Sequence, residues 1–104
     1  EKQGMTIKNK DVQLYRVQTD PDKLVPCIHP PEPMNDEDVF LLVQNVTRQI
    51  YIWLGSKASV RTRFVGARCA SNLHREKGMV YRVISINQTY ESPEFRSALA
   101  QSFS

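Results

Sequence analysis

Two uninterrupted apolar runs constrain the fold of this chain more than any other feature. They cover residues 39–43 and 50–54, and only the short polar segment 44–49 separates them. A strand with one face in solvent alternates apolar and polar residues, whereas a continuous apolar run is typical of a strand covered on both faces. The sequence therefore predicts a buried β-hairpin with one layer of structure above it and another below it.

A long helix is predicted directly after this hairpin. Ser59 is a suitable N-cap residue, the helical pattern continues to about residue 77, and Gly78 is suited to end the helix. Pro26 lacks a backbone N–H group, so the extended segment around it is expected at a sheet edge. The other predicted elements are strands over 12–18, 23–29 and 79–86, a loop over 30–38 and a short final helix over 93–103.

The long helix is predicted to pack one face on the sheet. When residues are placed about 100° apart, this core face consists of Gly66, Ala70 and Leu73, flanked by Ala67 and Cys69. The opposite side is expected to carry a basic stripe of Arg61, Arg68 and Arg75, with Phe64 and Val65 at its margins. The helix is thus expected to have an apolar inner face and a basic outer face.

These elements predict an α+β fold, an α/β sandwich. We expect a central mixed sheet of about five strands between one long helix and one short C-terminal helix. A chain of 104 residues is long enough for one domain and too short for two. We assign residues 12–104 to that domain and the polar residues 1–11 to an N-terminal tail or an inter-domain linker.

Charge and cysteine content argue against several classes of protein. The 14 basic and 11 acidic residues give a net charge of +3, a weak positive balance for a dedicated nucleic-acid-binding domain. No apolar stretch approaches the roughly 20 residues that span a membrane. Cys27 and Cys69 are far apart in sequence and are expected to be free buried thiols in a reducing compartment. We therefore expect a soluble cytoplasmic domain.

Enzyme and metal sites find little support in the motifs. The sequence has no glycine-rich phosphate loop, no serine-centred nucleophile elbow and no paired carboxylates in a plausible cleft, so no catalytic residue is assigned. A zinc site can be imagined from Cys27, His29, Cys69 and His74, but their spacing fits no standard zinc pattern. The acidic run 36–38 is expected to be a solvated loop.

Several segments resemble the gelsolin/villin repeat, the actin-regulating module of gelsolin, villin and severin. They are LYRV (14–17), NDEDVFLL (35–42), IYIWLGSKAS (50–59) and YESPEFRSAL (90–99), together with Arg63. The resemblance implies a gelsolin-like fold and a non-enzymatic role in the actin cytoskeleton. It also implies that the chain is one repeat of a larger actin-binding protein, with actin and neighbouring repeats as partners.

The same resemblance implies a calcium site within the repeat, and the residues here depart from it. Asp38 matches the family's ligand aspartate, but Glu37 replaces the glycine often found before it, and the position of the ligand glutamate falls at Thr62. Threonine has no charge to offset the dehydration of Ca²⁺, and Arg61 and Arg63 would add two positive charges. We expect a degenerate site, no cofactor and no calcium control, with Asp38 as a capping or solvated carboxylate.

The resemblance further implies that the long helix contacts actin, because the family's strongest actin contacts insert that helix into an apolar cleft. An arginine-rich outer face disfavours such insertion, since burying an unpaired cation is costly. We then expect contact with actin through another surface, or none. As alternatives, the cations bind phosphoinositides or a membrane, or form a solvated face of a scaffolding repeat. These candidate partner-binding residues are Lys57, Arg61, Arg63, Arg68 and Arg75.

Overall fold

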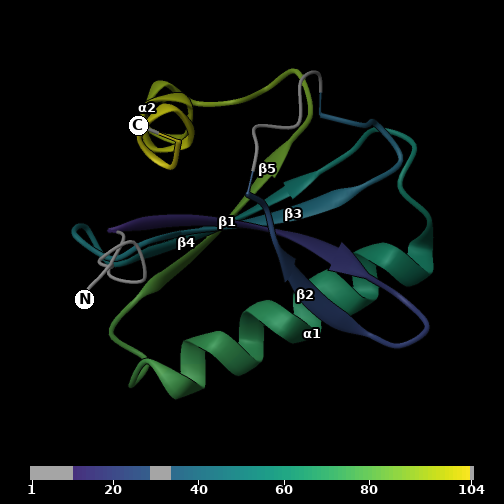
Figure 1. The fold of residues 1–104 in the computed structure, drawn as a ribbon, viewed down its shortest axis with the longest axis horizontal. Coiled ribbons are helices and arrows are strands. Elements are labelled where there is room, and N and C mark those ends of the chain that lie inside the picture. Colours follow the sequence, from purple (N-terminus) through teal and green to yellow (C-terminus); the bar gives the residue numbers. More distant parts are fainter. Residues whose placement is uncertain (1–10, 29–33, 104) are drawn as a thin grey trace.

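The computed structural model describes residues 11–28 and 34–103. In chain order these residues form β1 (Val12–Gln18), β2 (Lys23–Pro26), β3 (Val39–Gln44), β4 (Gln49–Leu54), α1 (Val60–Glu76), β5 (Arg82–Asn87) and α2 (Pro93–Gln101). The strands form one sheet in the order β2-β1-β3-β4-β5, with α1 on one face and α2 on the other (Figure 1). The predicted α+β fold, a mixed sheet between a long and a short helix, is confirmed.

The sheet is antiparallel except at its β5 edge. β3 and β4 form the predicted hairpin, in which Val39 pairs with Leu54 and Gln44 pairs with Gln49. β4 and β5 are parallel, and α1 supplies the crossover that a parallel pair requires. β5 therefore forms one edge of the sheet and β2 forms the other.

Both faces of the central hairpin are buried, as the continuous apolar runs predict. All six residues of β3 are buried. Because successive strand residues point to opposite faces, the hairpin contributes to two apolar clusters. The cluster under α1 contains Val17, Val39, Leu41, Ile50, Ile52, Val65 and Ala70. The cluster under α2 contains Val12, Leu14, Phe40, Leu42, Tyr51, Trp53, Ile86, Phe95 and Ala98.

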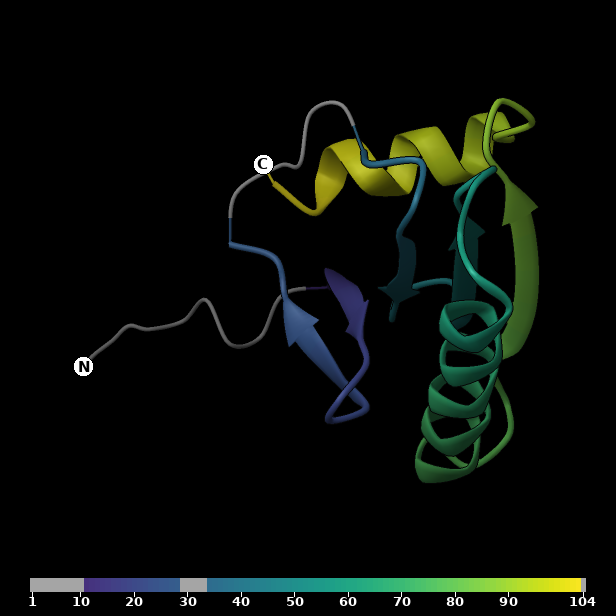
Figure 2. The ribbon, with the colours of Figure 1, turned by 90° about the vertical axis from the view of Figure 1, so that its right-hand side faces the viewer.

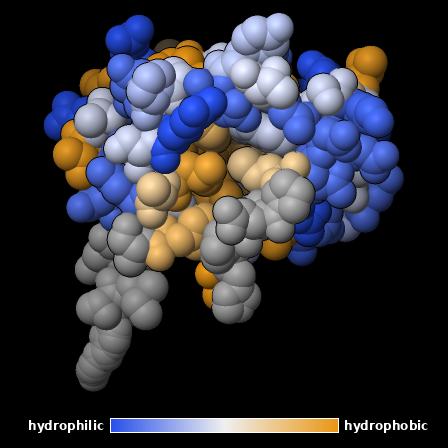
Figure 3. Space-filling model, turned by 90° about the horizontal axis from the view of Figure 1, so that it is seen from above, coloured by the Kyte–Doolittle hydropathy of each residue, from blue (hydrophilic) through white to orange (hydrophobic). Residues whose placement is uncertain are grey.

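The two helices cover their faces differently. α1 runs roughly along the direction of β5, whereas α2 lies across one end of the sheet (Figure 2). Seen from the α2 side, hydrophobic surface is visible in the middle of the molecule with hydrophilic side chains around it (Figure 3). Cys27, Met34, Leu99 and Phe103 are only partly buried where they pack against the cluster on this side. The nine-residue α2 thus leaves part of the apolar layer near the surface.

The ends of α1 lie where the sequence predicts them. Ser59 is the N-cap, and its hydroxyl accepts a hydrogen bond of 3.1 Å from the Thr62 N–H group. Lys77 is the C-cap, and Gly78 follows with a φ of 83°. This left-handed conformation is open to glycine without the steric cost of a Cβ atom, which explains why the helix ends here.

The predicted faces of α1 are wrong at their margins. Val65, expected beside the outer face, is 1% exposed, whereas Ala67, expected beside the core face, is exposed. Periodicity fixes the spacing of residues on a helix but not the flank that a sheet covers. A Cβ added to Gly66 would lie 2.8 Å from Val39 Cγ1 and 3.6 Å from Val17 Cγ2. This close approach over β3 and β1 brings the Val65 flank into the core.

Two predicted strands are shorter than expected. β2 ends at Pro26 rather than at residue 29, and His29 lies outside the described residues. β5 begins at Arg82 rather than at residue 79, because its pairing with β4 starts opposite Gln49, the first residue of β4. The predicted tail over 1–11 lies almost wholly outside the described residues, so that domain boundary stays a prediction.

Candidate functional site

The outward side of α1 carries two large apolar side chains where a basic stripe was expected. Val60 is 85% exposed and Phe64 is 61% exposed. Residues four apart lie on the same side of a helix, so these two form one surface, here named the outer apolar pair. The sequence prediction placed Phe64 only at the margin of the outer face and missed Val60, although their four-residue spacing is visible in the sequence.

Arg61 and Arg68 point from α1 toward the turn between β1 and β2. Arg61 Nη2 lies 3.2 Å from Asp22 Oδ1, and Arg68 Nη2 lies 3.1 Å from Asp22 Oδ2. Arg61 Nη2 also lies 3.6 Å from Asp20 Oδ1. Each arginine side chain is more than half exposed, so each pair contributes at most about 1 kcal/mol. The pairs nevertheless draw both guanidinium groups to one flank of the helix and leave the outer apolar pair accessible.

Arg63 belongs to the corner between β4 and α1 and not to the outer face. Its Nε–H group donates to the Ala58 carbonyl at 3.1 Å, and its Nη2–H group donates to the Gly55 carbonyl at 3.0 Å. Gly55 itself is tightly enclosed, because an added Cβ would lie 2.3 Å from the Asp36 carbonyl oxygen. The guanidinium group therefore stabilises a sharp turn in which position 55 has no room for a side chain.

The remaining two candidate cations lie at opposite ends of α1. Lys57 is exposed two residues before the N-cap, and its N–H group donates to the Asp36 carbonyl at 2.8 Å. Arg75 is exposed in the last turn, and its Nη2–H group donates to Asn72 Oδ1 at 2.6 Å. The five predicted cations therefore do not form one patch: two share an aspartate, one holds a turn, and two lie a helix length apart.

At the expected calcium site, Thr62 and the neighbouring Arg63 make hydrogen bonds within the corner between β4 and α1. The Thr62 hydroxyl lies 2.8 Å from the Ser59 hydroxyl, and the guanidinium group of Arg63 occupies the carbonyls at the same corner. Within residues 11–28 and 34–103, no group of three or more His, Cys, Asp or Glu side chains could hold a metal ion. Calcium requires six to eight oxygen ligands, so the residues around Asp38 and Thr62 do not fit the site that the resemblance implies.

The two cysteines lie on opposite sides of the sheet. Cys27 packs against the cluster under α2, whereas Cys69 packs against the cluster under α1. The imagined zinc set of Cys27, Cys69 and the histidines therefore cannot form. Both thiols are free and only partly buried, which corrects the expectation of full burial. Partial desolvation raises the pKa of each thiol, so both are protonated and weakly nucleophilic at neutral pH.

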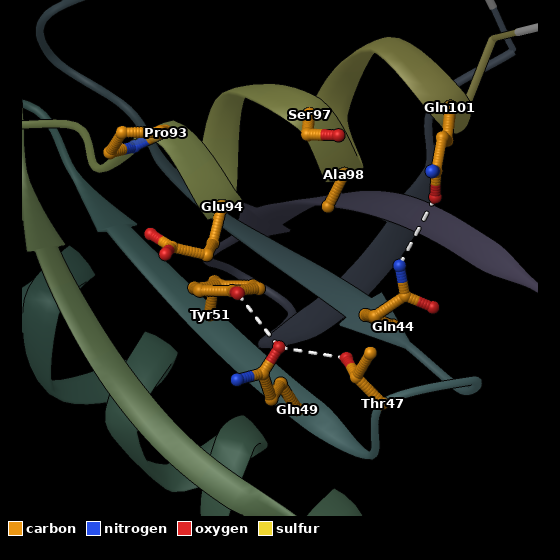
Figure 4. Close-up of a pocket in the computed structure, with 9 residues that line it drawn as sticks. All are labelled: Gln44, Thr47, Gln49, Tyr51, Pro93, Glu94, Ser97, Ala98 and Gln101. Carbon is orange, nitrogen blue, oxygen red and sulfur yellow. Dashed lines mark hydrogen bonds between the residues drawn. The ribbon is translucent and has the colours of Figure 1, made fainter.

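A groove of about 380 Å³ lies between α2 and the β3–β4 hairpin. Thr47, Gln49 and Tyr51 point toward one another, and so do Gln44 and Gln101 (Figure 4). The hydroxyls of Thr47 and Tyr51 both donate to Gln49 Oε1 at 2.8 Å, and Gln44 Nε2 donates to Gln101 Oε1 at 3.2 Å. Desolvation, together with the nearby Glu94 carboxylate, raises the pKa of Tyr51, so its hydroxyl remains a proton donor. These contacts pair five of the groove's polar side chains with one another, and none of them sets a nucleophile beside a base.

The order of the elements, the buried hairpin and the strand-to-helix corner agree with a known repeat. The family profile of the gelsolin repeat matches residues 32–96, more than half of the chain. The chain belongs to the gelsolin-repeat family. In the described part of this gelsolin repeat, no helix is both long and apolar enough to cross a membrane. Comparison with curated proteins gives no match.

Two solved structures are similar to this gelsolin repeat. A chain in the crystal structure of the Thorarchaeota ProGel/rabbit actin complex superposes with a TM-score of 0.77 at 25% identity, covering 85% of this chain and 98% of that one. A chain in the Thorarchaeota 2DGel3/rabbit actin complex superposes with a TM-score of 0.72 at 24% identity. That match covers 94% of this chain but only 49% of the other, and at this identity it shows the fold alone.

Proposed function

We propose that this gelsolin repeat is a non-enzymatic, actin-binding module of a larger cytoplasmic protein of the cytoskeleton. Family membership supports the proposal, and so does the likeness to Thorarchaeota ProGel, whose structure was determined as a complex with rabbit actin. The observation that carries the proposal is the outer apolar pair, because it replaces the expected obstacle to docking, a row of unpaired arginines, with exposed apolar surface.

The docking surface that we propose is the N-terminal half of α1. Phe64 supplies its largest apolar side chain, and the Arg68 guanidinium carbon lies 5.9 Å from the centre of the Phe64 ring. Aromatic side chains and arginines are enriched among the residues that dominate binding energies at interfaces. Because Asp22 pairs with both Arg61 and Arg68, and Asp20 also lies near Arg61, docking would not bury an unpaired cation.

Co-sedimentation of the 104-residue chain with filamentous actin, and binding to monomeric actin, test this surface. We expect Phe64→Ala to weaken actin binding about ten-fold, the effect of removing one central apolar anchor. Val60→Ala removes less apolar area and should have a smaller effect in the same direction.

Tyr90→Ala is the matched control, since Tyr90 is 80% exposed but lies in the turn after β5. It should bind actin as the unmodified chain does. Actin binding that survives Phe64→Ala unchanged would exclude the outer apolar pair, and no binding by the unmodified chain would contradict the proposed function itself.

The phosphoinositide alternative finds less support at the predicted residues. Of the five candidate cations, Arg61 and Arg68 share Asp22, and Arg63 donates to two backbone carbonyls. A phosphate group would have to compete with these partners.

We likewise propose that the repeat acts without calcium, since the residues around Asp38 and Thr62 do not fit that ion. Neighbouring repeats of the parent protein are proposed as further partners.

A further inference from the structure

The groove between α2 and the β3–β4 hairpin contains hydrogen-bond donors that the domain itself does not use. Gln49 and Gln101 each accept hydrogen bonds through the side-chain oxygen. Within the part of the chain that the structure describes, the side-chain NH₂ group of neither glutamine has a partner. These free donors suit a ligand that is rich in acceptors, such as the carbonyl groups of an extended polypeptide.

The charge in the groove comes from Glu94, in the first turn of α2. Among the described residues its carboxylate has no ion-pair partner, and no basic side chain lines the groove. The groove therefore favours a cationic ligand over an anionic one. Tyr51 is buried, so a nucleobase finds no aromatic face on which to stack. Together these features select a hydrogen-bonding ligand that carries a positive charge.

The length of the groove suits a short extended segment. Glu94 and Tyr51 lie at one end of it, and Gln44 and Gln101 lie at the other (Figure 4). Seven residues of α2 separate Glu94 from Gln101, and at about 1.5 Å per residue they span roughly 10 Å. An extended chain advances about 3.3 Å per residue, so three residues cover that distance.

The polypeptide chain enters the described domain at the Gln44 end of this groove. The Asp11 carbonyl accepts a hydrogen bond of 2.7 Å from the Asn45 N–H group, and Asn45 directly follows Gln44. Residues 1–10 lie outside the described residues, and their sequence contains three lysines, at positions 2, 8 and 10, and one acidic residue, Glu1. This polar segment is thus tethered beside the groove and carries the charge that Glu94 favours.

We propose that the groove binds the segment that precedes β1, with residues 7–10 extended along α2 and the Lys8 ammonium group paired with Glu94. Lys8 lies three residues before Asp11, and three extended residues cover the roughly 10 Å between the two ends of the groove. Backbone carbonyls of the segment accept hydrogen bonds from the NH₂ groups of Gln49 and Gln101. Because the segment is tethered, its effective concentration is in the millimolar range and weak contacts suffice.

This proposal is separate from actin binding, because the groove and the outer apolar pair belong to opposite faces of the sheet. The groove lies beside α2, whereas Val60 and Phe64 project from α1 on the other face (Figure 1). Variants in the groove therefore leave the proposed actin-binding surface in place. The bound segment would fix the direction from which the chain enters the repeat.

Nuclear Overhauser effects in the 104-residue chain test the proposal. We expect effects between backbone protons of residues 7–10 and two sets of groove protons, those of the Tyr51 ring and those of the Gln49 and Gln101 NH₂ groups. Lys8→Glu should weaken these effects by up to about five-fold, the most that one exposed ion pair contributes. Glu94→Lys should weaken them similarly. The double charge reversal, Lys8→Glu with Glu94→Lys, should restore them.

Lys2→Glu is the matched control, because it makes the same charge change nine residues before Asp11, beyond the end of the groove. It should leave the effects as they are in the unmodified chain. The intrinsic fluorescence of the buried Trp53 checks that each variant is folded. Absence of the effects in the unmodified chain would overturn the proposal and leave the groove to a partner's peptide. An equal loss in Lys2→Glu, or no restoration by the double reversal, would overturn the pairing of Lys8 with Glu94.

Actin co-sedimentation of the same variants separates this proposal from the proposed function. All of them should bind actin as the unmodified chain does. Failure of the unmodified chain to bind actin would contradict the proposed function and leave the groove proposal to the nuclear Overhauser effects, which decide it on their own.

Discussion

At the scale of single residues, Arg63 is fixed by two hydrogen bonds from its side chain to the backbone. One guanidinium group donates to two carbonyls, those of Gly55 and Ala58, which lie on the sharp turn from β4 into α1. The sequence prediction placed this arginine among the candidate partner-binding cations. Its geometry instead makes it a positioning residue for the start of α1, the part of the helix that carries the outer apolar pair.

Arg63→Ala is expected to lower the free energy of unfolding by about 1–2 kcal/mol, because it removes two charge-assisted hydrogen bonds from a partly buried turn. Urea unfolding followed by Trp53 fluorescence measures the change. Arg63→Lys keeps the charge but not the two-pronged donor, so it should recover only part of the loss. Arg75→Ala, on the exposed last turn of the same helix, should change stability by no more than about 0.5 kcal/mol.

At the scale of elements, Glu91 connects the loop before α2 to the centre of the sheet. The indole N–H group of the buried Trp53 in β4 donates to Glu91 Oε2 at 2.9 Å. Partial desolvation on its own raises the pKa of the Glu91 carboxyl. Hydrogen bonds from Trp53 and from the backbone N–H groups of Glu91 and Thr89, together with the charge of Arg96, outweigh it, so the pKa lies below its ordinary value of 4.5.

A lowered pKa in the folded state gives a defined pH dependence. The contribution of Glu91 to stability is complete above the ordinary pKa of 4.5 and is lost as the pH falls through the lowered value. Glu91→Gln keeps an acceptor for Trp53 but cannot titrate. We expect its unfolding free energy to fall less than that of the unmodified chain between about pH 6 and pH 3, measured by urea unfolding. An equal decrease in both proteins would contradict this assignment.

The elements also show how far the sequence alone predicts the structure. The hairpin and the ends of α1 follow from local signals, namely continuous apolar runs, a serine N-cap and a glycine after the C-cap. The rotation of α1 does not, because the flank that is buried depends on the close approach of Gly66 to Val39 on another element. The outer face was mispredicted for a related reason. Arg61 and Arg68 pair with Asp22, which lies 39 and 46 residues earlier in the sequence, and this long-range contact directs both side chains to one flank of the helix.

At the scale of the whole molecule, we expect the repeat to work without calcium. Isothermal titration with Ca²⁺ should show no dissociation constant tighter than about 10 µM, because the residues around Asp38 and Thr62 do not supply a set of charged oxygen ligands. Binding to magnesium-loaded actin should be the same with calcium as with a chelator. Tight calcium binding to the isolated chain would show that the corner between β4 and α1 rearranges around the ion.

The rigidity of α1 bears on how the proposed docking surface would be presented. The helix is capped by hydrogen bonds at both ends and packed on the sheet between them, so its ends cannot move independently. A partner that held the first turns of α1 would therefore fix the orientation of the whole sheet, and with it the direction in which the rest of the repeat projects.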